Sequence, residues 1–219
     1  MEVHSDLAQR AVVDSHALDW LGDPQTGITY KVLECDGEAR QRTTTLVRLA
    51  PGSAFPTHGH PLGEEVYVLE GTWLDGEPHP AGSYLRYPAG YEHAPSSPEG
   101  CLLLVKTGQM LAPPDSRVVV QGGGLPWEPR PLPLAEGRSL FHHPATGETV
   151  YLVRFAPGFR SQHDPHPAGE EVLVLEGEVH DEHGVYPAGT WFRWPAGSQH
   201  APHSPAGATL WVKKGHVVP

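Results

Sequence analysis

A long internal repeat constrains the fold of this chain more than any other feature. The segment LVRLAPG at residues 46–52 returns as LVRFAPG at 152–158, and PAGSYLRYPAG at 80–90 returns as PAGTWFRWPAG at 187–197. The first pair is offset by 106 residues and the second by 107, so one residue is inserted between them. We place this insertion at a hairpin tip, where LDGEPH in the first copy faces HDEHGVY in the second. A chain of 219 residues that repeats itself over this length is expected to form two similar domains.

Short apolar runs within each copy predict β-strands. Runs such as TTLVRLA, EVYVLEG and CLLLVKT end at or near proline or glycine, which is typical of strands bounded by turns. The 25 Gly and 24 Pro disfavour long helices, because proline removes a backbone donor and glycine costs conformational entropy. We therefore expect an all-β protein of two tandem barrels or sandwiches, the first within residues 1–112 and the second within 113–219. Residues 109–135 form the connection between them.

Charge and hydropathy exclude two classes of partner. The formal net charge of −11 repels phosphate backbones, and no cluster of Lys or Arg offsets it, so we do not expect nucleic acid as a partner. No apolar run approaches the roughly 18 residues that a membrane-spanning helix needs, and the segment MEVHSDLAQR lacks the pattern of a secretory signal. We expect a cytoplasmic protein that does not bind membranes. Cys35 and Cys101 form no CxxC pair and are expected to be small buried side chains.

Histidines and a glutamate gather at one place in the first copy. Because alternate side chains of a strand share a face, His58 and His60 point the same way. Glu64 follows a short PLG loop that brings a carboxylate back towards them, and His93 arrives from another strand after the turn PAGYE. Three imidazoles and one carboxylate suit a divalent first-row metal and leave positions open for water or substrate.

The spacing of these residues resembles the two sequence motifs of the cupin family. The first motif is matched by Gly52, His58, His60, Glu64 and Gly71, and the second by Gly82, Pro88, Gly90 and His93. Ser97 stands where the second motif often has Asn, which is not a metal ligand. The segments GEEVYVLEG and HAPSSPEG most resemble the cupin domain of the ChrR anti-sigma factors, and this resemblance covers roughly residues 43–108 and 147–215.

The resemblance implies a fold and a cofactor. The fold would be two tandem double-stranded β-helix barrels of the jelly-roll type, which together make a bicupin. The cofactor would be a divalent transition metal, up to two ions per chain, with iron or zinc ahead of manganese or nickel. Paired barrels in one chain favour a monomer with internal pseudo-two-fold symmetry or a homodimer.

The second copy departs from the first at one ligand position. His166, Glu170 and His200 match the motifs, but Asp164 stands in the place of His58, and His163 lies one residue earlier. Side-chain parity favours Asp164 as the inward residue, whereas Pro165 interrupts the strand and permits a bulge that turns His163 inward. Both alternatives stay open at this point. A carboxylate in place of an imidazole shifts the preference of a site towards harder ions.

Three functions fit these residues. The first is a metal-dependent enzyme, of the dioxygenase kind, that acts on a small organic molecule such as a diketone. The second is a ChrR-like regulatory or sensor module that binds zinc; residues 1–42 contain no HxxxCxxC spacing, so the domain that grips the sigma factor in that family is not expected here. The third is a structural duplication with incidental metal. The substrate or ligand is not specified by the sequence, because fold alone does not determine function.

Overall fold

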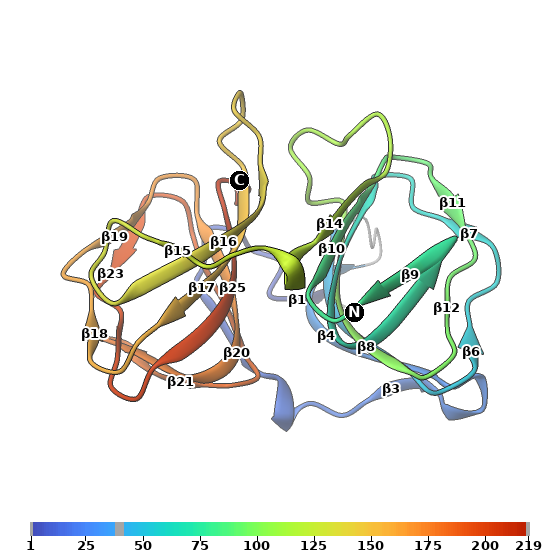
Figure 1. The fold of residues 1–219 in the computed structure, drawn as a ribbon, viewed down its shortest axis with the longest axis horizontal. Helices are drawn as coiled ribbons and strands as arrows, with labels where there is room; N and C mark the ends of the chain where they lie inside the picture. Colours follow the sequence, from blue (N-terminus) through green and yellow to red (C-terminus); the bar gives the residue numbers. More distant parts are fainter. Residues whose placement is uncertain (1, 38–41, 218–219) are drawn as a thin grey trace. The chain divides into compact units, whose positions relative to one another are not determined.

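The computed structural model describes residues 2–37 and 42–217, which form two compact units built almost entirely of β-strands (Figure 1). The first unit comprises the chain up to Ser5 and Leu18–Leu125, and the second comprises Asp6–Ala17 and the chain from Pro126 onward. The expected all-β fold in two halves is confirmed. Helical segments among the described residues are short 3-10 turns, and none is long and apolar enough to cross a membrane.

The two units have matching elements. The first unit holds β1 (Glu2–Val3), β3 (Leu21–Asp23), η2 (Pro24–Thr26), β4 (Ile28–Asp36), β5 (Thr43–Leu49), β6 (Ser53–Ala54), β7 (His58–Gly59), β8 (Glu64–Asp75), β9 (Glu77–Pro80), β10 (Ser83–Tyr87), β11 (Glu92–His93), β12 (Ser96–Ser97), β13 (Cys101–Thr107), β14 (Val118–Gln121) and η4 (Gly122–Gly124). The second unit holds β2 (Ala11–Asp14), η1 (Ser15–Ala17), β15 (Glu128–Pro129), β16 (Ala135–His142), β17 (Thr149–Phe155), β18 (Phe159–Arg160), β19 (Asp164–His166), β20 (Glu170–Asp181), β21 (Gly184–Pro187), β22 (Thr190–Trp194), β23 (Ser198–His200), β24 (His203–Ser204) and β25 (Ala208–Lys214).

Each unit is an antiparallel barrel with the same strand order. The main sheet of the first unit runs β1-β4-β5-β13-β8-β10-β14, and that of the second runs β15-β16-β17-β25-β20-β22-β2. A separate two-stranded sheet, β7 with β11 or β19 with β23, lies in each unit and carries histidines. Some neighbours in the main path, such as β5 and β13 or β17 and β25, come from distant parts of the chain, as in a jelly roll.

β2 of the first repeat and β14, its equivalent at the start of the second, each complete the barrel formed mainly by the other repeat. β14 pairs with β10 of the first unit, whereas β2 pairs with β22 of the second unit. Ala11 and Val118, which begin β2 and β14, occupy equivalent places in the two repeats, 107 residues apart. A division of the sequence near residue 112 therefore separates repeats, whereas the compact units exchange one strand each. The boundary at 112/113 stays a prediction.

Alternating side chains build the core of each barrel and aim the candidate ligands. In β8, Val66 and Val68 are buried in the first core, and Glu64 shares their face two residues earlier. In β20, Val172 and Val174 are buried in the second core, and Glu170 lies on the same face. Each glutamate thus continues an inward row of apolar residues, which places its carboxylate inside the barrel.

Candidate metal centres

The first candidate site joins the small sheet of the first barrel to the start of β8. His58 of β7 and His93 of β11 are direct partners across the strand pair, and their ring centroids are 4.7 Å apart. The ring of His60 lies 4.9 Å from that of His58 and 5.6 Å from that of His93. One nitrogen from each of the three rings lies within 4.8 Å of the others, a spacing that one metal ion can bridge.

Glu64 reaches two of these rings, those of His60 and His93, through a tight turn, but it lies outside the set of donors that are all within 4.8 Å of one another. The turn closes with a hydrogen bond from the Gly63 amide to the His60 carbonyl, 3.0 Å long. Gly63 has a φ of +79°, and a Cβ at this position would lie 2.8 Å from the Tyr87 carbonyl oxygen, so glycine alone fits. The carboxylate of Glu64 then lies 3.3 Å from His60 Nε2 and 3.6 Å from His93 Nε2.

Burial shifts the pKa of two of these donors, Glu64 and His60. Burial, followed by repulsion from Asp75, raises the pKa of Glu64 to about 8. Burial, followed by the charges of His58 and His93, lowers the pKa of His60 to about 4, so its imidazole is neutral and able to donate a lone pair.

Three donor atoms of this site are buried without a hydrogen-bond partner among the described residues. They are His60 Nε2, Glu64 Oε2 and His93 Nε2. Buried polar atoms in proteins are almost always paired, so an unpaired set that converges on one point indicates a missing partner. A divalent cation accepts imidazole nitrogens and a carboxylate together, and the residues present therefore fit such an ion.

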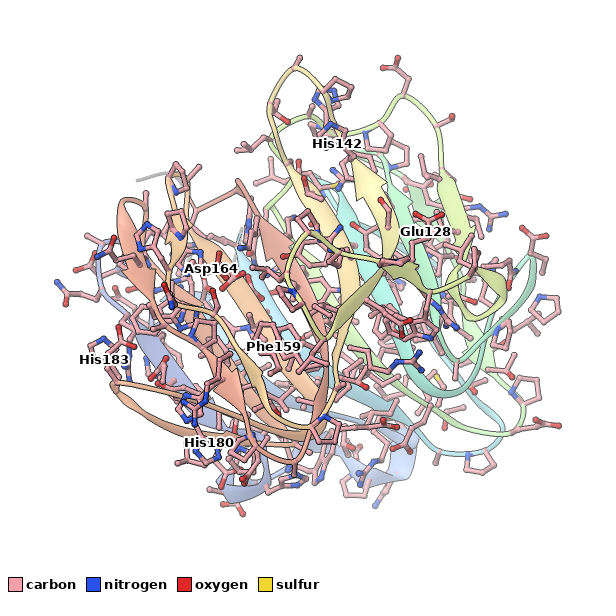
Figure 2. The ribbon with its side chains drawn as sticks, turned by 60° about the vertical axis from the view of Figure 1, so that its left-hand side comes forward. Glu128, His142, Phe159, Asp164, His180 and His183 are labelled. Carbon is pink, nitrogen blue, oxygen red and sulfur yellow. The ribbon has the colours of Figure 1, made fainter. Side chains whose placement is uncertain are left out.

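The second candidate site gathers Asp164, His166, Glu170 and His200, whose donor atoms also lie within 4.8 Å of one another. Asp164 (Figure 2) and His200 are partners across β19 and β23. The Oε2 atom of Glu170 lies 3.5 Å from His166 Nε2 and 3.8 Å from His200 Nε2. Asp164 Oδ2 lies 3.9 Å from His200 Nε2. Burial, first among the causes, lowers the pKa of His166 to about 3, so that ring is neutral as well.

The two neighbouring candidates for the fourth donor lie in different surroundings. Asp164 belongs to the cluster, whereas the His163 side chain is exposed and lies outside it. The carbonyl of His163 accepts a hydrogen bond from Ser161 Oγ, 3.2 Å long. The backbone thus keeps the alternation in which Asp164 and His166 face inward.

An aspartate supports one histidine in each site, and sequence reasoning missed both. Asp75 Oδ2 lies 3.5 Å from His93 Nδ1, and Asp181 Oδ2 lies 2.9 Å from His200 Nδ1. Burial opposes ionisation of the two carboxyl groups, but their hydrogen bonds to these imidazoles lower the pKa of each overall. Each aspartate holds its ring so that Nε2 faces the other donors. The repeat could have identified these two residues, because Asp75 and Asp181 end equivalent strands and lie 106 residues apart.

Lys214 is a third residue that the sequence analysis did not predict. Its Nζ atom lies 2.9 Å from Asp164 Oδ1 and 3.0 Å from Glu170 Oε1. Burial disfavours the ammonium, but attraction by Glu170, Tyr151 and Asp164 raises the pKa of Lys214 above its usual value. Burial raises the pKa of Glu170, and the positive charge of Lys214 partly offsets this rise.

A cavity of about 420 Å³ inside the second barrel reaches this site. Its charged and imidazole lining comes from Arg130, Asp164, Glu170, His200 and Lys214. Its walls are largely apolar and include Val172, Val179, Phe192, Leu210 and Val212. A small organic molecule fits a cavity of this size and composition, with one end beside the candidate ligands.

Comparison with known proteins identifies a family for both repeats. The model of the ChrR Cupin-like domain matches residues 8–111 and again residues 115–218. Each match includes the first strand of its repeat, which completes the opposite barrel. No curated protein matches the chain.

Solved structures share the fold at low sequence identity. A proposed dioxygenase from Nostoc punctiforme is 17% identical, with a TM-score of 0.77 over 97% of this chain and 85% of that chain. The pirin YhhW from Escherichia coli, in complex with nickel(II), is 13% identical, with a TM-score of 0.68 over 96% of this chain and 100% of that chain. Oxalate decarboxylase from Bacillus subtilis is 14% identical, with a TM-score of 0.66 over 99% of this chain and 80% of that chain. At these identities the similarity shows the fold alone.

Proposed function

Because the chain belongs to the family of ChrR cupin-like domains, we propose that it is a metal-binding bicupin that acts as a metal-dependent enzyme on a small organic molecule. The observation that carries the enzymatic proposal is the cavity of about 420 Å³ that ends at the donor atoms of the second barrel. A structural metal site is normally closed by protein ligands, whereas a catalytic site keeps space for substrate beside the ion.

We assign the first ion to His58, His60, Glu64 and His93, and the second to Asp164, His166, Glu170 and His200. Iron is the metal proposed for a dioxygenase-like reaction, with manganese and nickel as further candidates. A bound iron(II) ion would supply a Lewis acid and a redox centre at the end of the cavity. Nickel(II) in the related pirin supports a divalent transition metal in this fold.

The residues of the second barrel have separate tasks in this proposal. The apolar walls formed by Val172, Phe192 and Leu210 hold the carbon skeleton of the substrate and exclude water. Asp181 holds the His200 ring through its Nδ1 atom and so fixes the direction of Nε2. Glu170 is buried beside both histidines, and its Oε2 atom, 3.5 Å from His166 Nε2, would help to hold the ion.

A regulatory or sensor module that binds zinc is the alternative. It is favoured by the family itself, because the domain that matches both repeats is described through ChrR. The histidine-rich first site suits zinc, which accepts three imidazoles readily. A sensor of this kind needs a tightly bound ion but no turnover, and so differs from the enzyme in its reaction with oxygen.

Elemental analysis of the full chain, purified without added metal and without an affinity tag, tests metal binding first. We expect close to two equivalents of iron or manganese per chain, and about one equivalent in each of the variants His60→Ala and His166→Ala. Oxygen consumption with diketones and aromatic ketones then tests the enzyme. Iron with oxygen uptake supports the dioxygenase, zinc without uptake supports the sensor, and a folded parent that binds no divalent metal refutes both.

A further inference from the structure

The two candidate sites differ at two positions that change charge. His58 of the first site is replaced by Asp164 in the second, where each faces the partner histidine across the small sheet. Thr107, the last residue of β13, is replaced by Lys214, the last residue of β25. Thr107 pairs with Glu64 and Lys214 pairs with Glu170 in the same register, so the two positions are equivalent.

These two replacements cancel in formal charge. With a metal bound, ligating carboxylates are ionised and ligating imidazoles are neutral, so the donors of the first site would sum to −1, from Glu64 alone. On the same count, the carboxylates of Asp164 and Glu170 and the ammonium of Lys214 would again sum to −1 in the second site. The added carboxylate therefore has a matching cation next to it.

Lys214 contacts the carboxylates from the side away from the histidines. Its Nζ atom approaches Asp164 Oδ1 and Glu170 Oε1, at 2.9 and 3.0 Å, whereas Oδ2 and Oε2 are the oxygens nearest the imidazole nitrogens. One oxygen of each carboxylate thus remains directed towards the His166 and His200 rings. Two buried carboxylates would repel each other without the ammonium between them.

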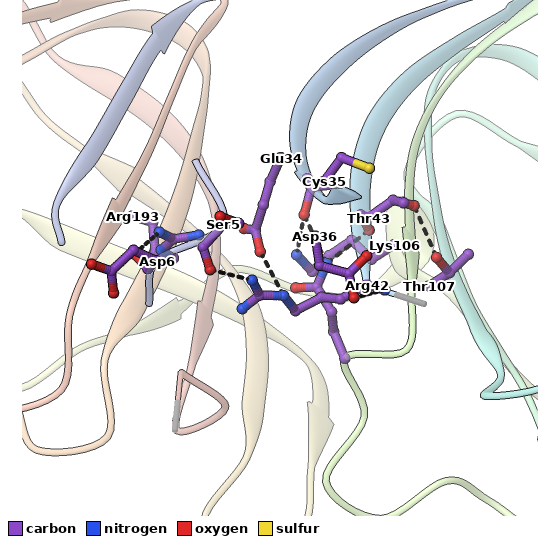
Figure 3. A network of polar contacts seen from close by, with 12 residues as sticks. Ser5, Asp6, Glu34, Cys35, Asp36, Arg42, Thr43, Lys106, Thr107 and Arg193 are labelled. Atoms are coloured by element: carbon purple, nitrogen blue, oxygen red, sulfur yellow. Dashed lines mark hydrogen bonds and ion pairs between the residues drawn. The ribbon is translucent and has the colours of Figure 1, made fainter. Parts of the chain in front are cut away.

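The equivalent residue of the first barrel makes a different contact. Thr107 Oγ1 shares a hydrogen bond of 2.8 Å with Thr43 Oγ1 (Figure 3) and brings no charge to Glu64. Both sites hold buried donors without a hydrogen-bond partner, but among the described residues a Lys ammonium contacts the donor carboxylates only in the second site.

We propose that Lys214 is the built-in counter-ion of the second site, which it keeps assembled without metal and whose metal affinity it lowers relative to the first site. The inference rests on the proposed binding of metal at both sites. A divalent ion entering the second site meets the positive charge of Lys214 and shares two carboxylates with it. In the part of the chain that the structure describes, no Lys or Arg side chain contacts the donors that an ion entering the first site would meet. The first site fills first when metal is limiting.

Titration of the metal-free full chain with Co(II) tests the proposal. Calorimetry gives the affinity, and the d–d absorption of Co(II) reports coordination independently of activity. The variant His60→Ala isolates the second site and His166→Ala isolates the first. We expect the second site to bind Co(II) at least about tenfold more weakly than the first, a change of the size that groups contacting metal ligands produce.

Charge at the two equivalent positions is then exchanged. Lys214→Gln, on the His60→Ala background, keeps hydrogen-bond donors but removes the charge; we expect Co(II) to bind about tenfold or more tightly and the metal-free protein to melt at a lower temperature. Thr107→Lys, on the His166→Ala background, should weaken the first site by a similar factor. Asp164→His with Lys214→Thr rebuilds the first donor set and should give the affinity of the first site.

The outcomes separate this proposal from the proposed function. If neither parent site binds Co(II) while circular dichroism shows folded protein, metal binding itself is refuted. If both sites bind, but Lys214→Gln weakens the second site or leaves it unchanged, Lys214 is not an opposing counter-ion. Should Lys214→Gln fail to fold, Thr107→Lys decides: unchanged affinity at the first site overturns the proposal.

Discussion

Glu64 leads to a quantitative prediction about the metal-free protein, whose free energy of unfolding should fall as pH rises from about 6.5 to about 8. Burial raises the pKa of Glu64 from 4.5 to about 8, so the folded carboxyl group keeps a proton that the unfolded chain releases. Below pH 6.5 this loss is offset, because burial lowers the pKa of His60 to about 4 and that of His166 to about 3. Below pH 6.5 these two imidazoles bind protons in the unfolded chain but not in the folded protein, so a rise in pH within that range favours the folded state.

The magnitude follows from the width of the window in which only the carboxyl effect remains. One proton bound by the folded state and not by the unfolded state changes stability by about 1.4 kcal/mol per pH unit. From pH 6.5, the usual pKa of histidine, to about 8, the loss due to Glu64 is about 2 kcal/mol. Glu170, whose pKa burial also raises, contributes a loss of the same sign as pH rises above its usual pKa.

Urea denaturation of the chelator-treated protein at pH 6.5 and 8.0 measures this effect. The variant Glu64→Gln keeps the shape of the side chain but does not titrate, so its stability should fall by about 2 kcal/mol less than that of the parent between the two pH values. A bound divalent ion should remove the difference, because Glu64 is then ionised as a ligand. An identical pH dependence in parent and variant would refute the reasoning.

Two further predictions concern the second barrel. Asp181→Asn should weaken metal binding at the second site by about 10- to 100-fold, measured by metal competition. Asp75→Asn should have a smaller effect at the first site, because Asp75 lies 3.5 Å from His93 whereas Asp181 lies 2.9 Å from His200. Equal effects would show that the shorter contact to His200 is not important. Phe192→Ala removes a side chain that is 2% exposed and lines the cavity, and should lower the free energy of unfolding by about 3–5 kcal/mol in urea; a loss below about 1 kcal/mol would show that the cavity wall collapses to fill the space.

The all-β fold in two similar halves was predictable from the sequence, because strand and turn signals are local. Apolar runs ending at proline or glycine gave strands such as β5 and β13, and the repeat placed their equivalents in the second half. Alternation within a strand is also local, so the inward direction of Glu64 and Glu170 follows from Val66 and Val172 two residues later.

Features that depend on which strands become neighbours were not predictable in this way. Lys214 contacts Glu170 and Asp164 only because β25 lies beside β20. The sequence of β25 does not indicate which strand will pair with it. The exchange of β2 and β14 is hidden for the same reason, since AVVD and VVVQ suit either barrel equally. The metal assignment itself stays a prediction for all its residues, including His163 and Asp164.

The exchanged first strands have a consequence for how this chain can evolve. A deletion that removes one repeat from the gene also removes the strand at one edge of the barrel that survives, either β14 beside β10 or β2 beside β22. The remaining barrel would regain that strand only from another copy of itself. The duplicated gene is therefore difficult to shorten to one barrel, except as a pair of identical chains. Residues 11–14 belong to the barrel of the second candidate site, whose first residues are encoded about 150 codons downstream, so a substitution in β2 is selected by its effect on that barrel.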